Sequence, residues 1–473
     1  MVVGNIGTGT QVAILGGGPG GYVAAIRAAQ LGKDVTVIEK DKLGGVCLQR
    51  GCIPSKAIIY AANEFYKISK LANMGVTVEG AKVDFTKLQA WKTANVAQLT
   101  AGIDGLFKKH GITLIKGNGF FVGPRRIQVV VDDQPQYIDF EHAIIATGSR
   151  PIFPPGLEAD GEIVISSTEA LELKTIPKTM VIVGGGYIGL ELGVAYAKLG
   201  THVTVVEKYT LAANIDRDLL TALFETMEKL GIKIYEFTDV QRVQKENGKA
   251  VVSINVKDKG MITLETEKVL VSIGRRPNTD AIGLDKAGVN VNEKGFVPVN
   301  EKRQTNDPRI YAIGDVSGHP MLAHKAYAEA KVAAECIAGK PSAFDTTVIP
   351  WVMFSDPEIA GVGLSESDAQ NAGHKIKVGK FPFAALGRAV STSQTTGFVK
   401  IVAEEGSERI LGVHIVGSHA SGMVSEAALG LEMGMTLDDL ALTIHPHPTF
   451  PEALAEAAEV TLGKAIHLFQ KKS

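Results

Sequence analysis

Cysteine is scarce in this chain, with three copies among 473 residues. So few cysteines cannot build a disulfide scaffold, and their scarcity predicts a reducing compartment, with the cytoplasm as the expected location. The apolar stretch Val12–Leu15 is too short for a signal peptide and follows no positively charged lead. The sequence also lacks an apolar run long enough to span a membrane, so we expect no membrane segment.

An excess of either charge is absent as well. Lys and Arg total 49, Asp and Glu total 51, the net charge is −2, and no dense run of basic residues occurs. This balance argues against nucleic acid or an anionic membrane as a partner. Apolar residues at 45 % and charged residues at 21 % are ordinary for a globular protein, and the length predicts two to four domains.

Glycine, by contrast, is abundant, with 52 copies, and its placement reveals an internal repeat. Residues 11–40 and 179–208 align without a gap at a shift of 168. Each copy reads as an apolar strand, a glycine-rich turn, a helix and a second strand that ends in Glu. Units of this kind form dinucleotide-binding domains, so the repeat predicts two such domains.

Each copy carries the pattern G-x-G-x-x-G, which suits a phosphate-binding turn. The glycines are Gly16, Gly18 and Gly21 in the first copy, and Gly184, Gly186 and Gly189 in the second. A tight turn, a closely approaching pyrophosphate and close packing of helix on strand each require a missing side chain. The helix start then offers unpaired N–H groups to the phosphates. Glu39 and Glu207 lie 18 residues past the last glycine of each motif, where a carboxylate accepts hydrogen bonds from a ribose.

Similar segments also close the two units. Ala143–Pro151 reads A-I-I-A-T-G-S-R-P, and Val269–Pro277 reads V-L-V-S-I-G-R-R-P. They place Thr147 and Gly148 at the end of the first unit and Gly274 at the end of the second. We therefore expect one dinucleotide-binding domain over residues 1–150 and another over residues 151–278.

Beyond these units the sequence changes to an α+β texture. Ile310–Val316 predicts a short strand that ends in Gly-Asp, where Asp315 closes a simple turn or binds the polyol of a flavin. A last helical segment is expected near Pro451–Phe469. The predicted fold is α/β, with two Rossmann-like dinucleotide-binding domains, a central domain over 279–347 and a C-terminal α+β dimerisation domain over 348–473.

The segment from 44 to 56, G-G-V-C-L-Q-R-G-C-I-P-S-K, holds the candidate redox site. On a regular helix Cys47 and Cys52 would point roughly 140° apart, so a disulfide between them requires a helix start or a distorted turn. The surrounding glycines and proline permit such a distortion, and a helix N-terminus would lower a thiol pKa. Two structural thiols or half a zinc site are the alternatives, but no other cysteine lies near enough to complete a zinc set. Cys336, on the apolar side of a predicted helix, is interpreted as a core thiol.

A proline-rich segment near the C-terminus, I-H-P-H-P-T-F-P-E from 444 to 452, carries His445, His447 and Glu452. Prolines hold this backbone stiff. A histidine with a carboxylate five residues later can act as a base whose tautomer is set by the acid, which is what a dithiol reaction needs. From the spacing alone, a structural histidine is about equally expected.

Taken together, these motifs resemble the pyridine nucleotide–disulfide oxidoreductase family. The resemblance covers nearly the whole chain, because the motifs recur in the family's order: the two glycine motifs, the 44–56 segment, A-T-G-S at 146–149, A-I-G-D-V at 312–316 and H-P-T-x-x-E at 447–452. Within the family, the chain is most similar to the branch that oxidises dihydrolipoamide and passes the electrons to NAD⁺. Members of that branch serve the lipoylated acyltransferase core, E2, of 2-oxo acid dehydrogenase complexes.

The resemblance implies cofactors and roles for individual residues. The first motif would hold FAD, with Glu39 and Asp315 on its sugar and phosphate groups, and the second motif would hold NAD. Cys52 would be the thiolate against the flavin ring, and Cys47 the outer thiol that exchanges with substrate. Lys56 would lie near the flavin N5, paired with Glu191. Glu452 would orient His447, the base toward Cys47, which would reach the site from the second subunit of a homodimer.

The second site is expected to choose NAD over NADP. Glu207 would repel the 2′-phosphate of NADP, which favours a nearby Arg instead. No metal site is expected. The alternatives to dihydrolipoamide oxidation are an NADH-dependent reductase of another small disulfide and a subunit whose main role is docking in a multienzyme complex.

Three residues depart from the common pattern of the family. Val46 and Arg50 stand where Thr and Val are usual, and Arg50 either shifts a thiol pKa or faces solvent. Tyr187, inside the second glycine motif, is larger than the usual aliphatic residue. We hypothesise that its ring closes the nicotinamide pocket until NAD binds.

Overall fold

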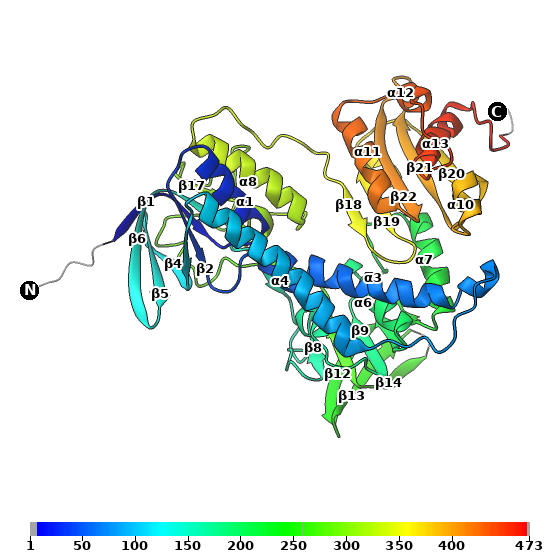
Figure 1. The fold of residues 1–473 in the computed structure, drawn as a ribbon, viewed down its shortest axis with the longest axis horizontal. Helices are drawn as coiled ribbons and strands as arrows, with labels where there is room; N and C mark the ends of the chain where they lie inside the picture. Colours follow the sequence, from blue (N-terminus) through cyan, green and yellow to red (C-terminus); the bar gives the residue numbers. More distant parts are fainter. Residues whose placement is uncertain (1–6, 258, 471–473) are drawn as a thin grey trace, which may run out of the picture.

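The computed structural model describes residues 7–257 and 259–470 and consists of three packed regions (Figure 1). The first is built on a seven-stranded sheet of order β3-β2-β1-β6-β5-β4, in which β17 also pairs with β6. Its strands are β1 (Thr8–Leu15), β2 (Val35–Glu39), β3 (Thr113–Lys116), β4 (Asn118–Gly123), β5 (Arg126–Val131), β6 (Gln134–Ile145) and β17 (Ile310–Ala312). The early part of β6 pairs with β5, and its last residues pair with β17.

Helix α1 (Pro19–Gln30) connects β1 to β2 and packs against α8 (Ala323–Ile337), which follows β17 and the short 3-10 helix η2 (Gly314–Val316). Strands β1 and β2 are parallel, and their core residues are fully buried, as a sheet covered by helices requires. The stretch assigned to a central domain therefore contributes β17 and α8 to the first region.

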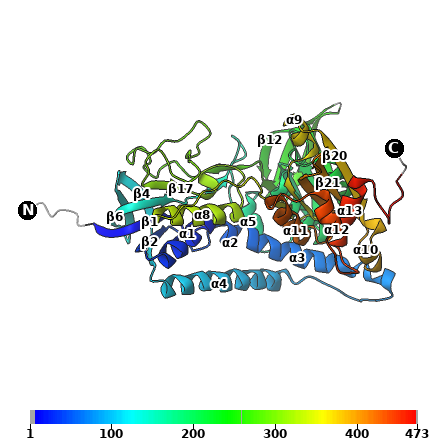
Figure 2. The same cartoon turned by 90° about the horizontal axis from the view of Figure 1, so that it is seen from above.

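A helical insert separates β2 from β3. It contains α2 (Gly45–Arg50), α3 (Cys52–Ile68), the 3-10 helix η1 (Leu71–Met74) and α4 (Phe85–Lys109). Figure 2 shows α3 and α4 side by side along one face of the molecule. Ile58, Ile59 and Ala62 on α3 are buried in the same core cluster as the second region, so α3 joins the two regions.

The second region repeats the parallel design. Its five-stranded sheet has the order β11-β10-β9-β15-β8, beside a three-stranded antiparallel sheet, β12-β13-β14. The elements are β8 (Val164–Ile165), α5 (Ser167–Leu171), β9 (Thr179–Val183), α6 (Tyr187–Lys198), β10 (His202–Val206), α7 (Arg217–Lys229), β11 (Lys233–Tyr235), β12 (Asp239–Glu246), β13 (Lys249–Val256), β14 (Gly260–Thr266) and β15 (Lys268–Val271). A two-stranded link, β7 (Ser149–Pro151) with β16 (Arg275–Pro277), connects this region to the first.

The third region is an α+β unit with a five-stranded antiparallel sheet of order β18-β19-β22-β21-β20. Its elements are β18 (Trp351–Met353), β19 (Ile359–Gly363), α9 (Glu366–Asn371), β20 (Ile376–Pro382), η3 (Phe383–Ala385), α10 (Gly387–Ser391), β21 (Gly397–Glu404), β22 (Ile410–Gly417), α11 (Ala420–Glu432), α12 (Leu437–Leu442) and α13 (Glu452–Leu462). The predicted fold class is confirmed, whereas the domain boundaries near 151, 279 and 348 stay predictions.

One element prediction was wrong at its C-terminal end. The helix expected near Pro451–Phe469 is α13, and it ends at Leu462. Gly463 follows with φ +72°, a left-handed conformation that ends a helix. Among the residues that the structure describes, no helix is both long and apolar enough to cross a membrane.

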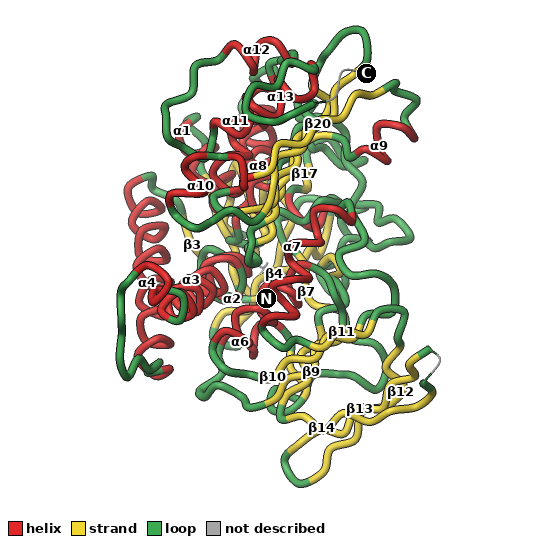
Figure 3. Tube along the Cα trace, turned by 90° about the vertical axis from the view of Figure 1, so that its right-hand side faces the viewer, coloured by secondary structure: helices red, strands yellow, loops and turns green. Residues whose placement is uncertain are grey.

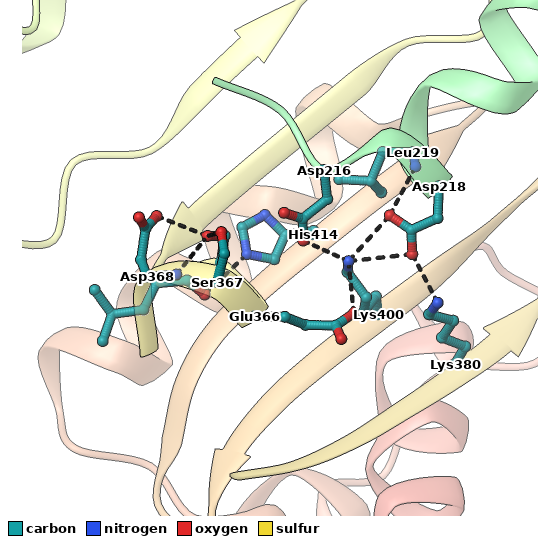
Figure 4. Close-up of polar contacts among 11 residues, drawn as sticks. Asp216, Asp218, Leu219, Glu366, Ser367, Asp368, Lys380, Lys400 and His414 are labelled. Atoms are coloured by element: carbon teal, nitrogen blue, oxygen red, sulfur yellow. Dashed lines mark hydrogen bonds and ion pairs between the residues drawn. The ribbon is translucent and has the colours of Figure 1, made fainter. Parts of the chain in front are cut away.

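A buried charge cluster joins the second and third regions (Figure 4). Lys400 on β21 is fully buried, and its Nζ donates to Asp216 Oδ2 at 2.6 Å, to Asp218 at 3.1 Å and to Glu366 Oε1 at 2.9 Å. Asp216 and Asp218 lie at the N-terminus of α7, and Lys380 on β20 pairs with Asp218 at 2.7 Å. The cluster therefore fixes α7 against the sheet of the third region.

Candidate active site

The redox segment is two short helices with a break between them. Cys47 lies inside α2, Cys52 is the first residue of α3, and Gly51 between the helices has φ −144° and ψ −112°. A side chain on Gly51 would come within 2.8 Å of the Val46 carbonyl oxygen, so this close turn requires glycine. The break provides the distortion that a contact between the two cysteines requires, and both are free thiols.

The two thiols differ strongly in acidity. The pKa of Cys52 is lowered to about 7, mainly because Cys47 donates a hydrogen bond to its sulfur; the surrounding protein opposes this shift, and the nearby Lys56 ammonium adds to it. The same hydrogen bond raises the pKa of Cys47. Cys52 is also exposed, whereas Cys47 is half-buried. Cys52 is thus the more acidic thiol of the pair, and Cys47 the less acidic one.

A cation and a carboxylate lie beside this thiolate. Lys56, one helical turn after Cys52, donates from Nζ to Glu191 Oε2 at 2.7 Å. The other carboxylate oxygen of Glu191, which belongs to α6, accepts from the backbone N–H of Phe354 at 2.8 Å. The Lys56 ammonium also lies 4.6 Å from the centre of the Phe354 ring. Residues from all three regions therefore meet at one ion pair, and Phe354 was not anticipated from the sequence.

The insert also contacts the first glycine motif directly. Gly44 N–H donates to the Gly17 carbonyl oxygen at 2.9 Å. Gly45, with φ +57°, lies so close that a side chain on it would be 2.6 Å from Gly18 Cα. The start of the redox helix is thereby held against the predicted FAD motif.

The two glycine motifs have the same geometry. Gly16 and Gly184 turn with φ of +107° and +103°. A side chain on Gly21 would be 1.8 Å from the Gly16 carbonyl oxygen, and one on Gly189 would be 2.5 Å from the Gly184 carbonyl oxygen. The first and third glycines are therefore required by the fold itself.

The middle glycines, Gly18 and Gly186, are not required by the fold. Their φ angles, −71° and −78°, suit any residue. A side chain on Gly186 would meet no atom within 4 Å, and one on Gly18 would make only an ordinary contact at 3.7 Å. Each glycine leaves open space in front of a helix N-terminus. This is the arrangement that a dinucleotide pyrophosphate fits.

Both helices after these glycines present unneutralised N-termini. Neither α1 nor α6 has a capping side chain or an acidic residue in its first turn. By comparison, Asp84 caps α4 and Ser365 caps α9. The positive ends of α1 and α6 are therefore free to face an anion.

The acids that end β2 and follow β10 are also placed alike. Glu39 accepts from the Gly17 N–H at 2.6 Å and from the Asp41 N–H at 2.8 Å. Glu207 accepts from the Gly185 N–H at 2.6 Å and from the Tyr209 N–H at 2.8 Å. These bonds aim each carboxylate toward its glycine turn and leave acceptor capacity for a ribose diol.

Hydrogen bonds connect the two segments that close the units, 143–151 and 269–277. Thr147 Oγ1 donates to the Asn278 carbonyl oxygen at 2.7 Å, and the Gly148 carbonyl accepts from Asn278 N–H at 2.9 Å. Gly148 has φ +70° and Gly274 has φ +136°. Gly274 also accepts from Ile152 N–H at 3.0 Å.

Asp315 belongs to this junction. It lies in η2 after β17 and accepts from Ser149 Oγ at 2.5 Å. Arg275 donates from Nε to the same Ser149 Oγ at 2.8 Å and also binds the Ser149 carbonyl. Ser149 and Arg275 were missed as site residues, although both lie in the paired closing segments that the sequence revealed.

Tyr187 stands where the two halves of the site meet. It is the first residue of α6, and nearly half of its surface is exposed. Removal from bulk water raises the pKa of its hydroxyl to about 12, Arg275 opposes the shift, and the negative charges of Glu191 and Cys52 add to it. Tyr187 thus begins the helix of the second glycine motif and lies near enough to Cys52 for the thiolate charge to act on its hydroxyl, which suits the predicted gate.

The predicted base is paired with its acid. His447 Nδ1 lies 2.8 Å from Glu452 Oε1, and Glu452 Oε2 accepts from the Thr449 N–H at 2.5 Å. The His447 side chain is 75 % exposed. His445, in contrast, is largely buried between Glu426 and the Thr443 carbonyl oxygen. His447 is therefore the histidine that a substrate thiol can reach.

The base and the thiols are not brought together within one chain. Figures 2 and 3 both separate α13, next to His447, from α2, which carries Cys47. The expectation that His447 reaches the thiols of a second subunit stays a prediction.

Two other predicted residues have clear positions. Arg50 forms an ion pair with Asp41, so its charge is held by an acid of the β2–α2 connection. Cys336 is half-buried, packs against a core cluster and donates to the Ser342 carbonyl oxygen at 3.0 Å.

Comparison with known proteins agrees with this geometry. Residues 10–330 match the model of pyridine nucleotide-disulphide oxidoreductases, and residues 349–458 match the dimerisation domain of the same family. The dihydrolipoyl dehydrogenase of Geobacillus stearothermophilus is 45 % identical over all of both chains, and that of Halobacterium salinarum is 46 % identical over the same share.

Solved structures give the same result. LpdA from Mycobacterium tuberculosis superposes with a TM-score of 0.88 at 27 % identity, over 95 % of this chain and 99 % of its own. The HOCl-induced flavoprotein disulfide reductase RclA from Escherichia coli superposes with a TM-score of 0.85 at 26 % identity, over 95 % and 99 %. The chain belongs to the pyridine nucleotide-disulphide oxidoreductase family, with the family's dimerisation domain at its C-terminal end.

Proposed function

We propose that this protein has dihydrolipoyl dehydrogenase activity. It oxidises protein-bound dihydrolipoamide to lipoamide through Cys47 and Cys52, uses FAD beside the thiols, and delivers the electrons to NAD⁺. The observation that carries the proposal is the unequal thiol pair, with the Lys56–Glu191 ion pair next to it, between two dinucleotide motifs. Full-length relatives of about 45 % identity bear the same activity in their names.

In the first half-reaction, the Cys47–Cys52 disulfide accepts two electrons from the dithiol. His447 takes the proton of one substrate thiol, and the resulting thiolate attacks the Cys47 sulfur. Cys52 leaves as a thiolate, and a pKa of about 7 makes it a good leaving group. The second substrate thiol then displaces Cys47 and passes its own proton to the departing Cys47 sulfur, which closes the lipoamide ring and leaves Cys47 as a thiol while His447 keeps the first proton.

FAD, which the first glycine motif and Glu39 would hold, would supply the two-electron chemistry between the thiols and the nicotinamide. Lys56 keeps a positive charge beside the Cys52 thiolate, and Glu191 holds Lys56 in place. A buried carboxylate needs a partner for each oxygen. Lys56 binds one oxygen of Glu191, and the Phe354 N–H binds the other.

NAD, rather than NADP, fits the second motif. Glu207 stands where a 2′-phosphate would lie, and two cations that follow it in the chain are already paired with acids. Lys208 pairs with Asp239 at 2.9 Å, and Arg217 pairs with Glu236 at 2.9 Å. A 2′-phosphate would therefore meet the Glu207 carboxylate, while Lys208 and Arg217 already have acidic partners.

Partners and location follow from the same proposal. The dimerisation domain implies a homodimer, and the exposed His447 would complete the site of the second subunit. The substrate would be the lipoyl group of an acyltransferase core, and the working location would be the cytoplasm.

The proposal is tested by steady-state turnover of the purified flavoprotein. We expect NAD⁺ reduction with dihydrolipoamide to exceed NADH oxidation with glutathione disulfide or coenzyme A disulfide. A higher rate with one of those disulfides would make the protein a different reductase. A Cys47→Ser variant should lose turnover yet still co-purify with the acyltransferase core, and loss of both would instead favour a structural role for this loop.

A further inference from the structure

Two large aromatic side chains lie exposed beside the second dinucleotide motif. Tyr209 is 65 % exposed and Phe237 is 67 % exposed. Tyr209 belongs to the loop 207–211 after β10, and Phe237 belongs to the loop 236–238 after β11. Because β10 and β11 are parallel neighbours, both loops leave the same edge of the sheet. Exposed aromatic residues at the carboxyl ends of parallel strands stand where ligands bind.

Backbone hydrogen bonds join the two loops. Phe237 N–H donates to the Tyr209 carbonyl oxygen at 3.0 Å, and Thr238 N–H donates to the Glu207 carbonyl oxygen at 2.9 Å. These bonds hold the backbones of Tyr209 and Phe237 next to each other. Both residues therefore lie close to Glu207, whose carboxylate is expected to bind ribose.

A second set of bonds, through Glu236, stiffens this arrangement. Its Oε1 accepts from the Leu211 N–H at 2.7 Å, from Thr210 Oγ1 at 2.8 Å and from Arg217 at 2.9 Å. The Arg217 hydrogen bond leads the effects that lower the pKa of Glu236 to about 2. The Glu236 carboxylate is therefore charged at every physiological pH, and its hydrogen bonds to Thr210 and Leu211 connect the two loops.

The backbone of Phe237 carries strain. Its φ is +52°, in the left-handed region, which a bulky side chain rarely adopts. Core packing does not account for this conformation, because the ring points largely into solvent. Strained residues of this kind tend to occur where a ligand is held.

We propose that Tyr209 and Phe237 bind the adenine ring of the nicotinamide dinucleotide by stacking. This inference rests on the proposed function. The pyrophosphate fits the α6 N-terminus at Gly186, and Tyr187 marks the nicotinamide end because it lies near Cys52. The adenine then lies on the far side of Glu207, where the two aromatic rings are.

The repeat supports a role special to the second site. The position that matches Tyr209 in the first copy is Asp41, which pairs with Arg50. The backbone bond from that position to the motif acid is the same in both copies. The aromatic ring is therefore not needed for the turn and belongs to the second site alone.

Binding of adenosine monophosphate to the flavin-loaded enzyme tests the proposal, because the first dinucleotide site is then filled. Phe237→Asn suits the experiment, since Asn tolerates the left-handed conformation. Tyr209→Ser removes the other ring and keeps the backbone bonds. Each change should weaken AMP binding, measured by calorimetry, by about 5- to 150-fold, the range that stacking of one base on an aromatic ring covers. Met261→Ser, which removes another exposed apolar side chain of the same region, should leave it unchanged.

Kinetics with two reductants supply the second measurement. The KM for NADH should rise in both variants, whereas the KM for reduced nicotinamide mononucleotide, which lacks adenine, should stay within twofold. The proposal is overturned by a double variant that binds AMP within twofold of the parent protein, or by equal losses with both reductants. Failure of dihydrolipoamide turnover in the parent would instead reject the proposed function and leave the AMP result standing.

Discussion

Lys56 and Glu191, 135 residues apart in the chain, form an ion pair of 2.7 Å that joins the redox helix to the second dinucleotide motif. The pair lies one helical turn from Cys52, and the Phe354 backbone completes it. Thiol acidity and the relative position of the regions therefore depend on the same contact.

Removal of the Cys47 thiol should make Cys52 less acidic. The hydrogen bond from Cys47 is the main cause of the lowered Cys52 pKa. In the reduced parent protein, the iodoacetamide reaction of Cys52 should rise as the pH passes about 7. In Cys47→Ala the rise should occur at higher pH, toward the ordinary thiol value of about 8.5. A profile still centred near 7 would contradict the assigned hydrogen bond.

Replacement of Glu191 by Gln should shift the Cys52 pKa the other way. The Glu191 carboxylate raises the pKa of Cys52. Its effect is smaller than the lowering by Cys47 and Lys56 and smaller than the raising by burial. Its loss should move the alkylation profile to lower pH by less than about one unit. Glu404→Gln, at an acid paired with His374 in the third region, is the matched control and should not move the profile.

Loss of the base should affect only the dithiol half of the reaction. We expect His447→Gln to lower kcat for dihydrolipoamide oxidation by about 10²- to 10⁴-fold, the usual contribution of a general base. Glu452→Gln should cause a smaller loss, because it only orients His447. Stopped-flow reduction of both variants by NADH should match the parent protein. Slow reduction by NADH would show that the loop has a wider role.

Substitution of a middle glycine should separate binding from folding. In Gly186→Ala the added methyl group meets no protein atom within 4 Å, and φ −78° is allowed. The unfolding temperature should therefore stay unchanged, while the KM for NAD⁺ rises by about tenfold or more, because the pyrophosphate loses its close approach. In Gly189→Ala the methyl group would lie 2.5 Å from the Gly184 carbonyl oxygen, so that variant should lose stability instead.

The charge cluster around Lys400 should dominate stability between the second and third regions. Lys400→Met leaves three carboxylates without their shared cation, and removal of one partner of a buried pair costs about 3–5 kcal/mol. Lys377→Met breaks a half-exposed pair with Glu408 and should cost under about 1 kcal/mol. Urea unfolding of both variants measures the difference, and equal losses would contradict the dominant role of the cluster.

The same cluster should weaken in acid. Although burial raises the pKa of Asp218, Lys380 and Lys400 hold it below the ordinary value. A depressed folded-state pKa stabilises the fold above the unfolded value, about 3.9, and this stability is lost as the pH falls through the folded value. As the pH falls below about 3.9, the free energy of unfolding should therefore decrease more in the parent protein than in Lys400→Met, as measured by urea unfolding at each pH.

Local chain requirements determined what the sequence revealed. Gly16 and Gly21 are required by a turn and a close contact within a few residues, so their spacing was readable and its repetition predicted both dinucleotide motifs. Gly51 likewise permits the helix break between the two cysteines. The pairing of Lys56 with Glu191 was anticipated only through resemblance to a family, because no local pattern links residues so far apart.

Tertiary structure alone decided the rest. Lys400 meets Asp216 and Asp218 because β21 packs against the start of α7, and a single lysine in a strand carries no sign of that contact. Phe237 faces solvent in a strained turn because Glu236 and Thr238 on either side are tied to another loop. The sequence alone predicted two dinucleotide motifs and a thiol pair, since short-range geometry encodes them. Which charges meet, and which aromatic rings stay exposed, depends on packing between distant segments, so only the folded chain shows it.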